Sequence, residues 1–149
     1  MKVAIAFQSS YGHNKAIADY LCQALESRGH IAASFDVKKS SPVEMAGFDL
    51  FLFSSPTHIG RAPRRMRAFL KGTVENEAGK PYGLICTKLP AGAGPSHDTV
   101  TLESMQDILR GDMNHLDSLS LDSLKIKGPL REGFEEKLDK FLDDILSKV

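Results

Sequence analysis

The chain has 149 residues, 42% of them hydrophobic, and its 19 Lys and Arg residues equal its 19 Asp and Glu residues, so the formal net charge is zero. A balanced charge argues against an obligate nucleic-acid binder or a protein of the membrane surface. The N-terminus lacks the basic start, long apolar stretch and cleavage site of a signal peptide. We therefore expect a cytoplasmic protein with one domain over residues 1–149. Cys22 and Cys86 form no CxxC pair and are expected as small core residues.

Short runs of β-branched and aromatic residues alternate along the chain with apolar residues at helical spacing. The expected strands cover 2–7, 32–36, 50–54, 82–87 and a stretch somewhere in 119–126, and the expected helices cover 15–27, 63–70, 99–110 and 132–146, with a short turn or helix near 42–46. This alternation predicts a parallel sheet covered on both faces. The first and third strands are apolar at successive positions, which is typical of strands buried on both sides.

The turn after the first strand has the composition of a phosphate-binding turn. It consists of Ser9, Ser10, Tyr11, Gly12, His13 and Asn14. The backbone N–H groups at a helix N-terminus lack intrahelical partners and attract anions, and the serine hydroxyls add donors. The turn contains neither G-x-G-x-x-G nor G-x-x-x-x-G-K-[ST], which favours a mononucleotide over a dinucleotide or a triphosphate. Ordinary helix capping explains the same residue types without any ligand.

Two further loops follow the third and fourth strands, and loops after parallel strands meet at the same edge of a sheet. The first contains Pro56, Thr57, His58, Ile59 and Gly60, and Pro63 should occupy the first position of the next helix. Its prolines stiffen it and its glycine permits a positive φ angle, so a flat heteroaromatic ring could lie against it. The second loop contains Thr87, Lys88, Leu89 and Gly92. Long loops of this kind are usually functional, so we expect a second wall of a ligand site there.

With these three loops, the chain resembles the flavodoxin-like family throughout its length, including the short-chain members. The form S-x-Y-G-H at 9–13 is also similar to the flavodoxin-like quinone reductases, and P-T-H-I-G at 56–60 resembles their P-T-R-F-G loop. The resemblance implies a doubly wound five-stranded parallel sheet in the order 2-1-3-4-5 that binds FMN without a metal. It implies that residues 9–14 hold the phosphate, that 56–60 pass along the flavin edge and that 87–94 close over the pyrimidine end. In the family, a peptide at the position of Gly60 can reorient when the flavin N5 gains a proton.

The resemblance implies an electron-transfer protein that carries electrons between redox partners, with no catalytic side chain. Two alternatives stay open: an NAD(P)H-dependent FMN quinone or flavin reductase, and an FMN-free binding or sensor domain of the same fold. The P-T-H-I-G loop and nearby arginines favour the reductase. His13, His58 and His97 match no metal-ligand spacing, so we expect no metal site.

The chain departs from electron-transfer flavodoxins, which typically stack the flavin between Trp and Tyr inside an acidic rim. It has no Trp, and the first stacking position holds His58 or Ile59 while the second offers Leu89. Cations follow the flavin loop where acidic members place carboxylates. These are Arg61, Arg64, Arg65 and Arg67. We expect a positive field that raises the flavin's second reduction potential and attracts an acidic partner or a nicotinamide dinucleotide phosphate, although a solvated helix face explains the arginines equally well.

Overall fold

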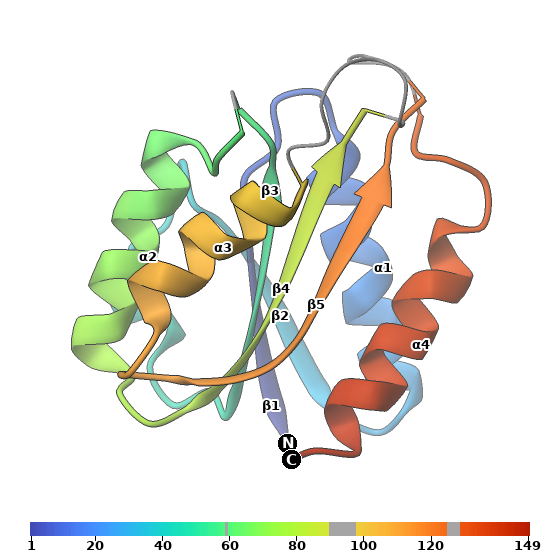
Figure 1. The fold of residues 1–149 in the computed structure, drawn as a ribbon. Helices are drawn as coiled ribbons and strands as arrows, with labels where there is room; N and C mark the ends of the chain where they lie inside the picture. The colour runs from blue at the N-terminus through green and yellow to red at the C-terminus, as the bar shows by residue number, and fades with distance from the viewer. Residues whose placement is uncertain (59, 90–97, 125–128) are drawn as a thin grey trace.

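The computed structural model describes residues 1–58, 60–89, 98–124 and 129–149. Within these ranges five parallel strands form one sheet in the order β2-β1-β3-β4-β5 (Figure 1). The strands are β1 (Lys2–Phe7), β2 (Ile31–Asp36), β3 (Leu50–Pro56), β4 (Pro81–Lys88) and β5 (Asn114–Asp122). The fold class and the strand order expected from the resemblance are confirmed.

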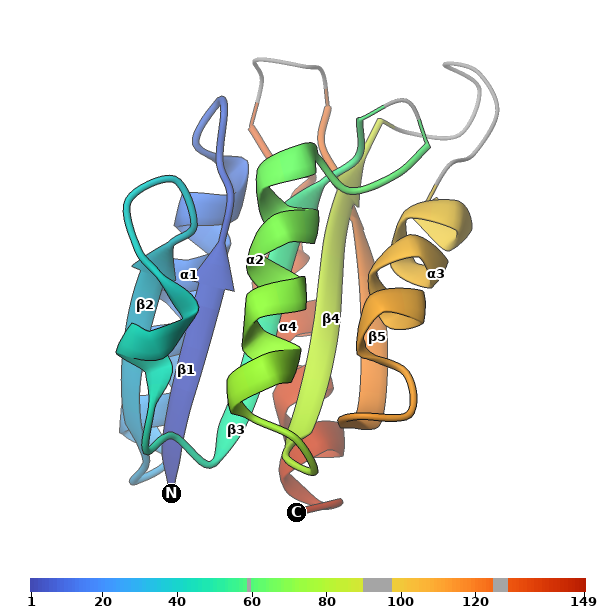
Figure 2. The same cartoon turned by 90° about the vertical axis from the view of Figure 1, so that its left-hand side faces the viewer.

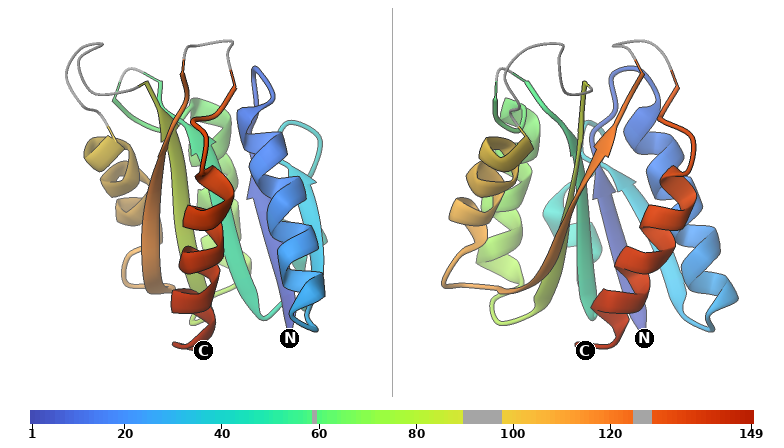
Figure 3. Two further views of the ribbon diagram at one scale, coloured as in Figure 1. Left: turned by 90° about the vertical axis from the view of Figure 1, so that its right-hand side faces the viewer. Right: turned by 45° about the vertical axis from the view of Figure 1, so that its right-hand side comes forward.

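Helices cover both faces of the sheet, as Figure 3 shows from two sides. The described helices are α1 (His13–Ser27), α2 (Arg64–Asn76), α3 (Asp98–Leu109) and α4 (Phe134–Leu146), with a short 3-10 helix η1 (Pro42–Met45). One apolar cluster joins α1 and α4 to the sheet, and a second joins α2, α3 and η1 to its other face. None of the helices in the described part of the chain is long and apolar enough to cross a membrane.

The central strands are buried on both sides, as their continuous apolar runs predict. Val3 and Ile5 of β1 pack in the cluster with α1 and α4, whereas Ala4 and Ala6 pack in the cluster with α2. All four side chains have no exposed surface. Successive strand residues point to opposite faces, so a strand between two helical layers must be apolar at every position. Fully burying a large aliphatic side chain stabilises the fold by about 1.5–3 kcal/mol.

Most elements end within one or two residues of the prediction, but one helix and one strand differ by more. Helix α2 continues to Asn76, six residues beyond the expected end, although Gly72 lies in its last part. A Cβ at Gly72 would lie 2.8 Å from Cγ of Pro42, so the glycine lets η1 pack closely on α2, and this packing outweighs its low helix propensity. Strand β5 begins at Asn114 instead of lying within 119–126. Its first half is polar and half-buried at the sheet edge, which hides it from an apolar pattern.

All strands point their carboxyl ends toward one edge of the sheet. The loops that follow β1 and β3 lie together at this edge, and both chain ends lie at the opposite edge (Figures 1 and 2). In a doubly wound sheet this carboxyl edge is where ligands bind. The fold therefore brings the loops selected from the sequence to one place.

Candidate functional site

A pocket of about 330 Å³ opens at the carboxyl edge between the loops that follow β1, β3, β4 and β5. It is lined by Ser9, Ser10, Tyr11, His13, Asn14, Pro56, Thr57, His58, Thr87, Lys88, Leu89 and Ser123. Every lining residue except Ser123 was expected from the sequence to bind a ligand. Of the other expected residues, Gly12 and Gly60 do not line this pocket, and Ile59 and Gly92 lie outside the described residues.

The turn between β1 and α1 presents the start of the helix to the pocket. Gly12 occupies the N-cap position with φ +91° and supplies no capping side chain, and the first turn of α1 contains no acidic residue. The Gly12 N–H donates to Ser9 Oγ at 3.0 Å, and Lys38 Nζ donates to the Ser9 carbonyl at 3.0 Å. Backbone N–H groups in a first helical turn lack intrahelical partners. The turn is thus suited to an anion, since it offers N–H donors, hydroxyls and a cation.

The side chain of Asn14 is already engaged within the protein. It is only 2% exposed, its Nδ2 donates to Thr87 Oγ1 at 3.1 Å, and its Oδ1 accepts a hydrogen bond from Ser54 Oγ at 2.6 Å. A carboxamide suits this place because one end donates and the other accepts. The side chain ties α1 to β3 and β4, so the backbone N–H is the group of Asn14 that remains for a ligand.

The loop after β3 is fastened to its neighbours. The Thr57 N–H donates to the Thr87 carbonyl at 3.1 Å, and Thr101 Oγ1 donates to Thr57 Oγ1 at 3.1 Å. His58 and Arg61 exchange backbone hydrogen bonds of 2.7 and 3.2 Å and close a tight turn in which Gly60 has φ +76°. A positive φ at Gly60 was expected and is confirmed. This φ favours glycine because other residues lose stability in the left-handed region.

The far wall of the pocket joins the ends of β4 and β5. The backbone N–H of Ser123 donates to the Lys88 carbonyl at 2.8 Å, and its hydroxyl donates to the same oxygen at 3.3 Å. The Lys88 ammonium lies 3.5 Å from Asp122 Oδ1, and Arg131 lies 3.5 Å from the other carboxylate oxygen. Lys88 therefore brings a paired charge to the pocket. Ser123 was missed because the sequence placed it inside an extended stretch and not at the carboxyl end of β5.

A second pocket of about 650 Å³ adjoins the first, and His58 lines both. It is lined by His58, Gly60, Arg61, Ala62, Pro63, Arg64, Arg67, Val100 and Ser104. Pro63 was expected at the first helical position of α2. It is instead the N-cap, because its ψ of 157° is extended. Gln8 replaces the missing cap, since its Oε1 accepts the Met66 N–H at 3.1 Å.

The part of the chain that the structure describes holds no group of three His, Cys, Asp or Glu side chains that could bind a metal ion. His97, Ser96 and the loop segment 90–97 lie outside the described residues. Cys22 is half-buried, Cys86 is buried, and neither forms a disulfide bond within the described chain. The described side chains that line the two pockets offer hydroxyl, amide, imidazole, guanidinium and ammonium groups, together with main-chain groups.

A family model described as a flavodoxin domain matches residues 4–120. The structure is similar to the flavodoxin of Streptococcus pneumoniae TIGR4, with a TM-score of 0.79, 18% identity and 100% of each chain covered. It is also similar to flavodoxin 1 from Bacillus cereus, with a TM-score of 0.80, 14% identity and coverage of 100% of this chain and 99% of that one.

A third similar structure is the Fusobacterium nucleatum flavodoxin bound to flavin mononucleotide, with a TM-score of 0.73, 15% identity and coverage of 99% of this chain and 98% of that one. No curated protein matches the chain. At these identities the solved structures establish the fold, and the family model establishes the kinship.

Proposed function

Because the chain belongs to the flavodoxin family, we propose that it is an FMN-binding electron-transfer protein that carries electrons between redox partners. The family and the FMN-bound flavodoxin among the similar structures support FMN as the cofactor. The observation that carries the proposal is the pocket of about 330 Å³ in which three loops of the expected type meet at the carboxyl edge. When bound, FMN supplies one- and two-electron redox chemistry.

The residues of the pocket fit a phosphorylated flavin. On one wall, Ser9 and Ser10 offer hydroxyls beside the uncapped start of α1, and a dianionic phosphate binds well to such a group of donors. On the other, Pro56 to His58 form a stiff wall that the hydrogen bond between Thr57 and Thr87 holds in place. This arrangement binds and orients the cofactor, and no side chain has to act as a nucleophile.

A test of the phosphate wall is the Ser9→Asp variant, in which a carboxylate oxygen can still accept the Gly12 N–H. We expect the affinity for FMN to fall about tenfold or more through like-charge repulsion, while the affinity for riboflavin changes little. Flavin fluorescence quenching on titration measures both. Ser27→Asp, at the far end of α1, is the matched control. Equal losses for both flavins, or no loss for FMN, would contradict the assignment of this turn to phosphate.

A second function, NAD(P)H-dependent reduction of quinones or flavins, is favoured by the adjoining pocket with its three arginines, because guanidinium groups bind phosphates. Anaerobic mixing of the FMN-loaded protein with NADH or NADPH separates the two functions. A carrier should show no rapid bleaching of the flavin absorbance without a partner protein. Rapid bleaching by either nucleotide would establish the reductase, and purified protein that takes up no flavin would leave only the binding or sensor domain.

A further inference from the structure

A basic surface lies beside the proposed FMN pocket and is built from two chain segments. It consists of Lys38, Lys39, Arg61, Arg64, Arg65 and Arg67. Arg65 Nη1 donates to the Lys38 carbonyl at 3.3 Å, so the loop after β2 and the start of α2 are in contact. Lys38 Nζ in turn donates a hydrogen bond to the Ser9 carbonyl in the turn between β1 and α1. The basic surface is therefore continuous with the pocket.

None of these six cations forms an ion pair with any acidic side chain in the ranges 1–58, 60–89, 98–124 and 129–149. Arg61, Arg64 and Arg65 are exposed, and the first turn of α2 contains no acidic residue. Cations at a helix N-terminus oppose the helix dipole and cost about 0.3–1 kcal/mol each. The start of α2 thus carries cations that oppose the helix dipole and that form no ion pair with the described residues.

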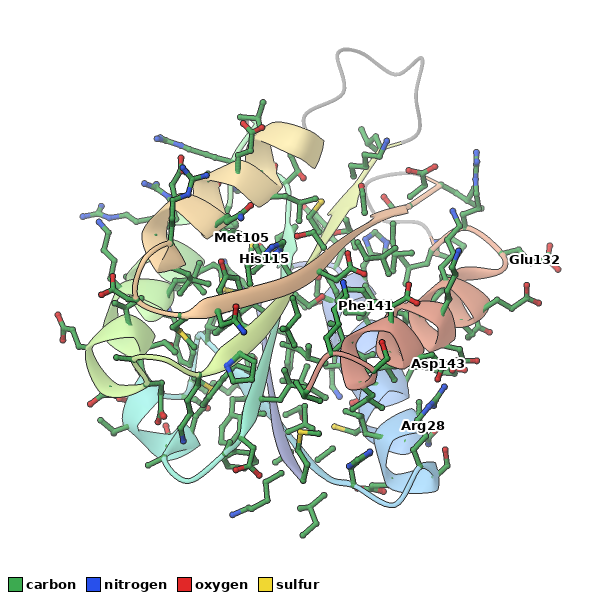
Figure 4. All side chains as sticks on the ribbon, turned by 60° about the horizontal axis from the view of Figure 1, so that its bottom comes forward. Arg28, Met105, His115, Glu132, Phe141 and Asp143 are labelled. Atoms are coloured by element: carbon green, nitrogen blue, oxygen red, sulfur yellow. The ribbon has the colours of Figure 1, made fainter. Side chains whose placement is uncertain are left out.

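Acidic side chains gather on the other side of the sheet, on and before α4. They are Glu132, Glu135, Glu136, Asp139, Asp143 and Asp144. Figure 1 shows α2 and α4 on opposite sides of the sheet, and Figure 4 labels Glu132 and Asp143 on the α4 side. The zero net charge therefore conceals an uneven distribution, although Lys137 and Lys140 on α4 offset part of the acidic charge. Such asymmetry orients an approaching charged protein and raises its association rate.

Large apolar side chains are exposed at the same carboxyl edge. Tyr11 is 54% exposed, Leu89 40%, Val100 50% and Leu124 52%. Tyr11 and Leu89 line the first pocket, and Val100 lines the second. A dinucleotide would need closely held guanidinium groups, whereas the side chains of Arg61 and Arg64 have no hydrogen bond to any described residue. Apolar side chains flanked by exposed charge are instead the composition of a protein interface.

We propose that the basic surface is the docking site for an acidic redox protein, which the arginines steer to the exposed rim of the FMN pocket. This inference rests on the proposed electron-transfer function, and it names the class of partner. The arginines orient the complex through long-range attraction, and the apolar side chains supply the contact area. An interface of this kind weakens as salt screens the charges.

The test uses one probe in two charge states, namely cytochrome c in its native basic form and with its lysines succinylated to make it acidic. Binding to the flavin-free protein is measured by isothermal titration calorimetry at about 20 mM ionic strength, where charges act over long distances. We expect binding of the succinylated form only. In the Arg61→Glu/Arg64→Glu variant, the dissociation constant for the succinylated form should rise about tenfold or more.

The matched control is Lys137→Glu/Lys140→Glu on α4, which changes the net charge by the same amount at exposed positions on the other face. This control should leave the affinity within about twofold of the parent protein. Equal weakening in both double variants, or no preference for the succinylated form, would overturn the proposal. So would saturable NADPH binding that only Arg61→Glu/Arg64→Glu abolishes, because the surface would then serve a nucleotide.

The FMN-loaded protein provides a second, independent readout. After chemical reduction, it should transfer electrons faster to succinylated than to native cytochrome c, and the order should reverse in Arg61→Glu/Arg64→Glu. Failure of the chain to take up FMN, with the calorimetric preference intact, would refute the proposed function and leave the docking surface standing. Uptake of FMN without any preference for the acidic probe would refute the docking surface and leave the proposed function standing.

Discussion

The two helical layers of this protein use their charges in opposite ways. Between α1 and α4, Arg28 lies 3.5 Å from Asp139 and 3.2 Å from Asp143, and the Tyr20 hydroxyl lies 3.0 Å from both oxygens of Asp139 (Figure 4). At the start of α2, no arginine forms an ion pair with a described acidic side chain. Arg28 in the first layer is thus paired with acidic side chains, whereas the arginines at the start of α2 form no ion pair with any described residue. This difference separates charge that holds the fold from charge that serves binding.

The largest effect should come from the packing beneath α4. A Cβ at Gly83 would lie 2.5 Å from Ile145 Cδ1 and 3.1 Å from Phe141 Cζ. We expect Gly83→Ala to lower the free energy of unfolding by about 3 kcal/mol, because the strand or α4 must move. Gly72→Ala meets only the ring of Pro42 and should cost less. Urea unfolding compares the two variants, and equal stability losses would show that both layers pack equally tightly.

The next largest effect should arise where α1 is tied to the sheet at the pocket. Asn14→Leu leaves the buried hydroxyls of Ser54 and Thr87 without their amide partner, which should cost about 2 kcal/mol. The resemblance implies that Asn14 helps to hold the phosphate of FMN; if its side chain had that role alone, the replacement would weaken flavin binding and leave the stability of the fold unchanged. Urea unfolding of the flavin-free variant shows whether the replacement lowers the stability of the fold itself. An unchanged midpoint would show that the internal hydrogen bonds contribute nothing.

A smaller change in the free energy of unfolding distinguishes Arg28, which is paired with acidic side chains, from Arg64 at the start of α2. Arg28→Ala should lower the free energy of unfolding by about 1 kcal/mol, since it removes an ion pair and packed methylene groups. Arg64→Ala should raise stability by about 0.3 kcal/mol, because it removes a cation from the positive end of α2. Chemical unfolding at low salt measures both changes. A loss of stability in Arg64→Ala would mean that the basic surface supports the fold.

The smallest effect concerns pH, and it lies on the α2 and α3 side of the sheet. Burial lowers the pKa of His115, whose ring is tilted by 52° to that of buried Tyr82 at a centroid distance of 5.3 Å. Asp117 opposes this pKa shift and Lys148 adds to it. The unfolded chain therefore binds more protons around the ordinary histidine pKa, so stability is present above it and falls as pH drops through the lowered pKa. The unfolding midpoint should decline less between about pH 7.5 and about pH 5 in His115→Gln than in the parent protein. Identical declines of the midpoint in the two proteins would show that His115 does not contribute to the pH dependence of stability.

Much of this architecture could be predicted from local patterns. Strands β1 and β3 are apolar at consecutive positions, and the turn at Gly12 and the loop at Gly60 carry the residue types that their backbone angles require. These signals are local, so the sequence alone displays them. The strand order came from the resemblance to a family. The cytoplasmic location, the extent of one domain and the roles of the ligand residues stay predictions.

The features that escaped prediction depend on residues far apart in the chain. The partners of Asn14 are 40 and 73 residues away, and only the folded sheet brings Ser54 and Thr87 to it. Ser123 lines the pocket because its own N–H and hydroxyl bind the carbonyl of Lys88 on another strand. Helix α2 continues past Gly72 because η1 packs there. In each case a tertiary contact decides what no local pattern encodes.

Gln8 gives the site a common anchor. Its backbone N–H binds the Ser54 carbonyl at 3.1 Å, and its side-chain oxygen caps the Met66 N–H, so a single buried residue fastens the end of β1 both to the neighbouring strand and to the first turn of α2. Gln8 therefore fixes the position of the first turn of α2, with its arginines, relative to the turn between β1 and α1. The side chains of Arg65 and Arg67 are themselves hydrogen-bonded to the carbonyls of Lys38 and Ala62, so the anchoring extends from the end of the strand to two of the guanidinium groups.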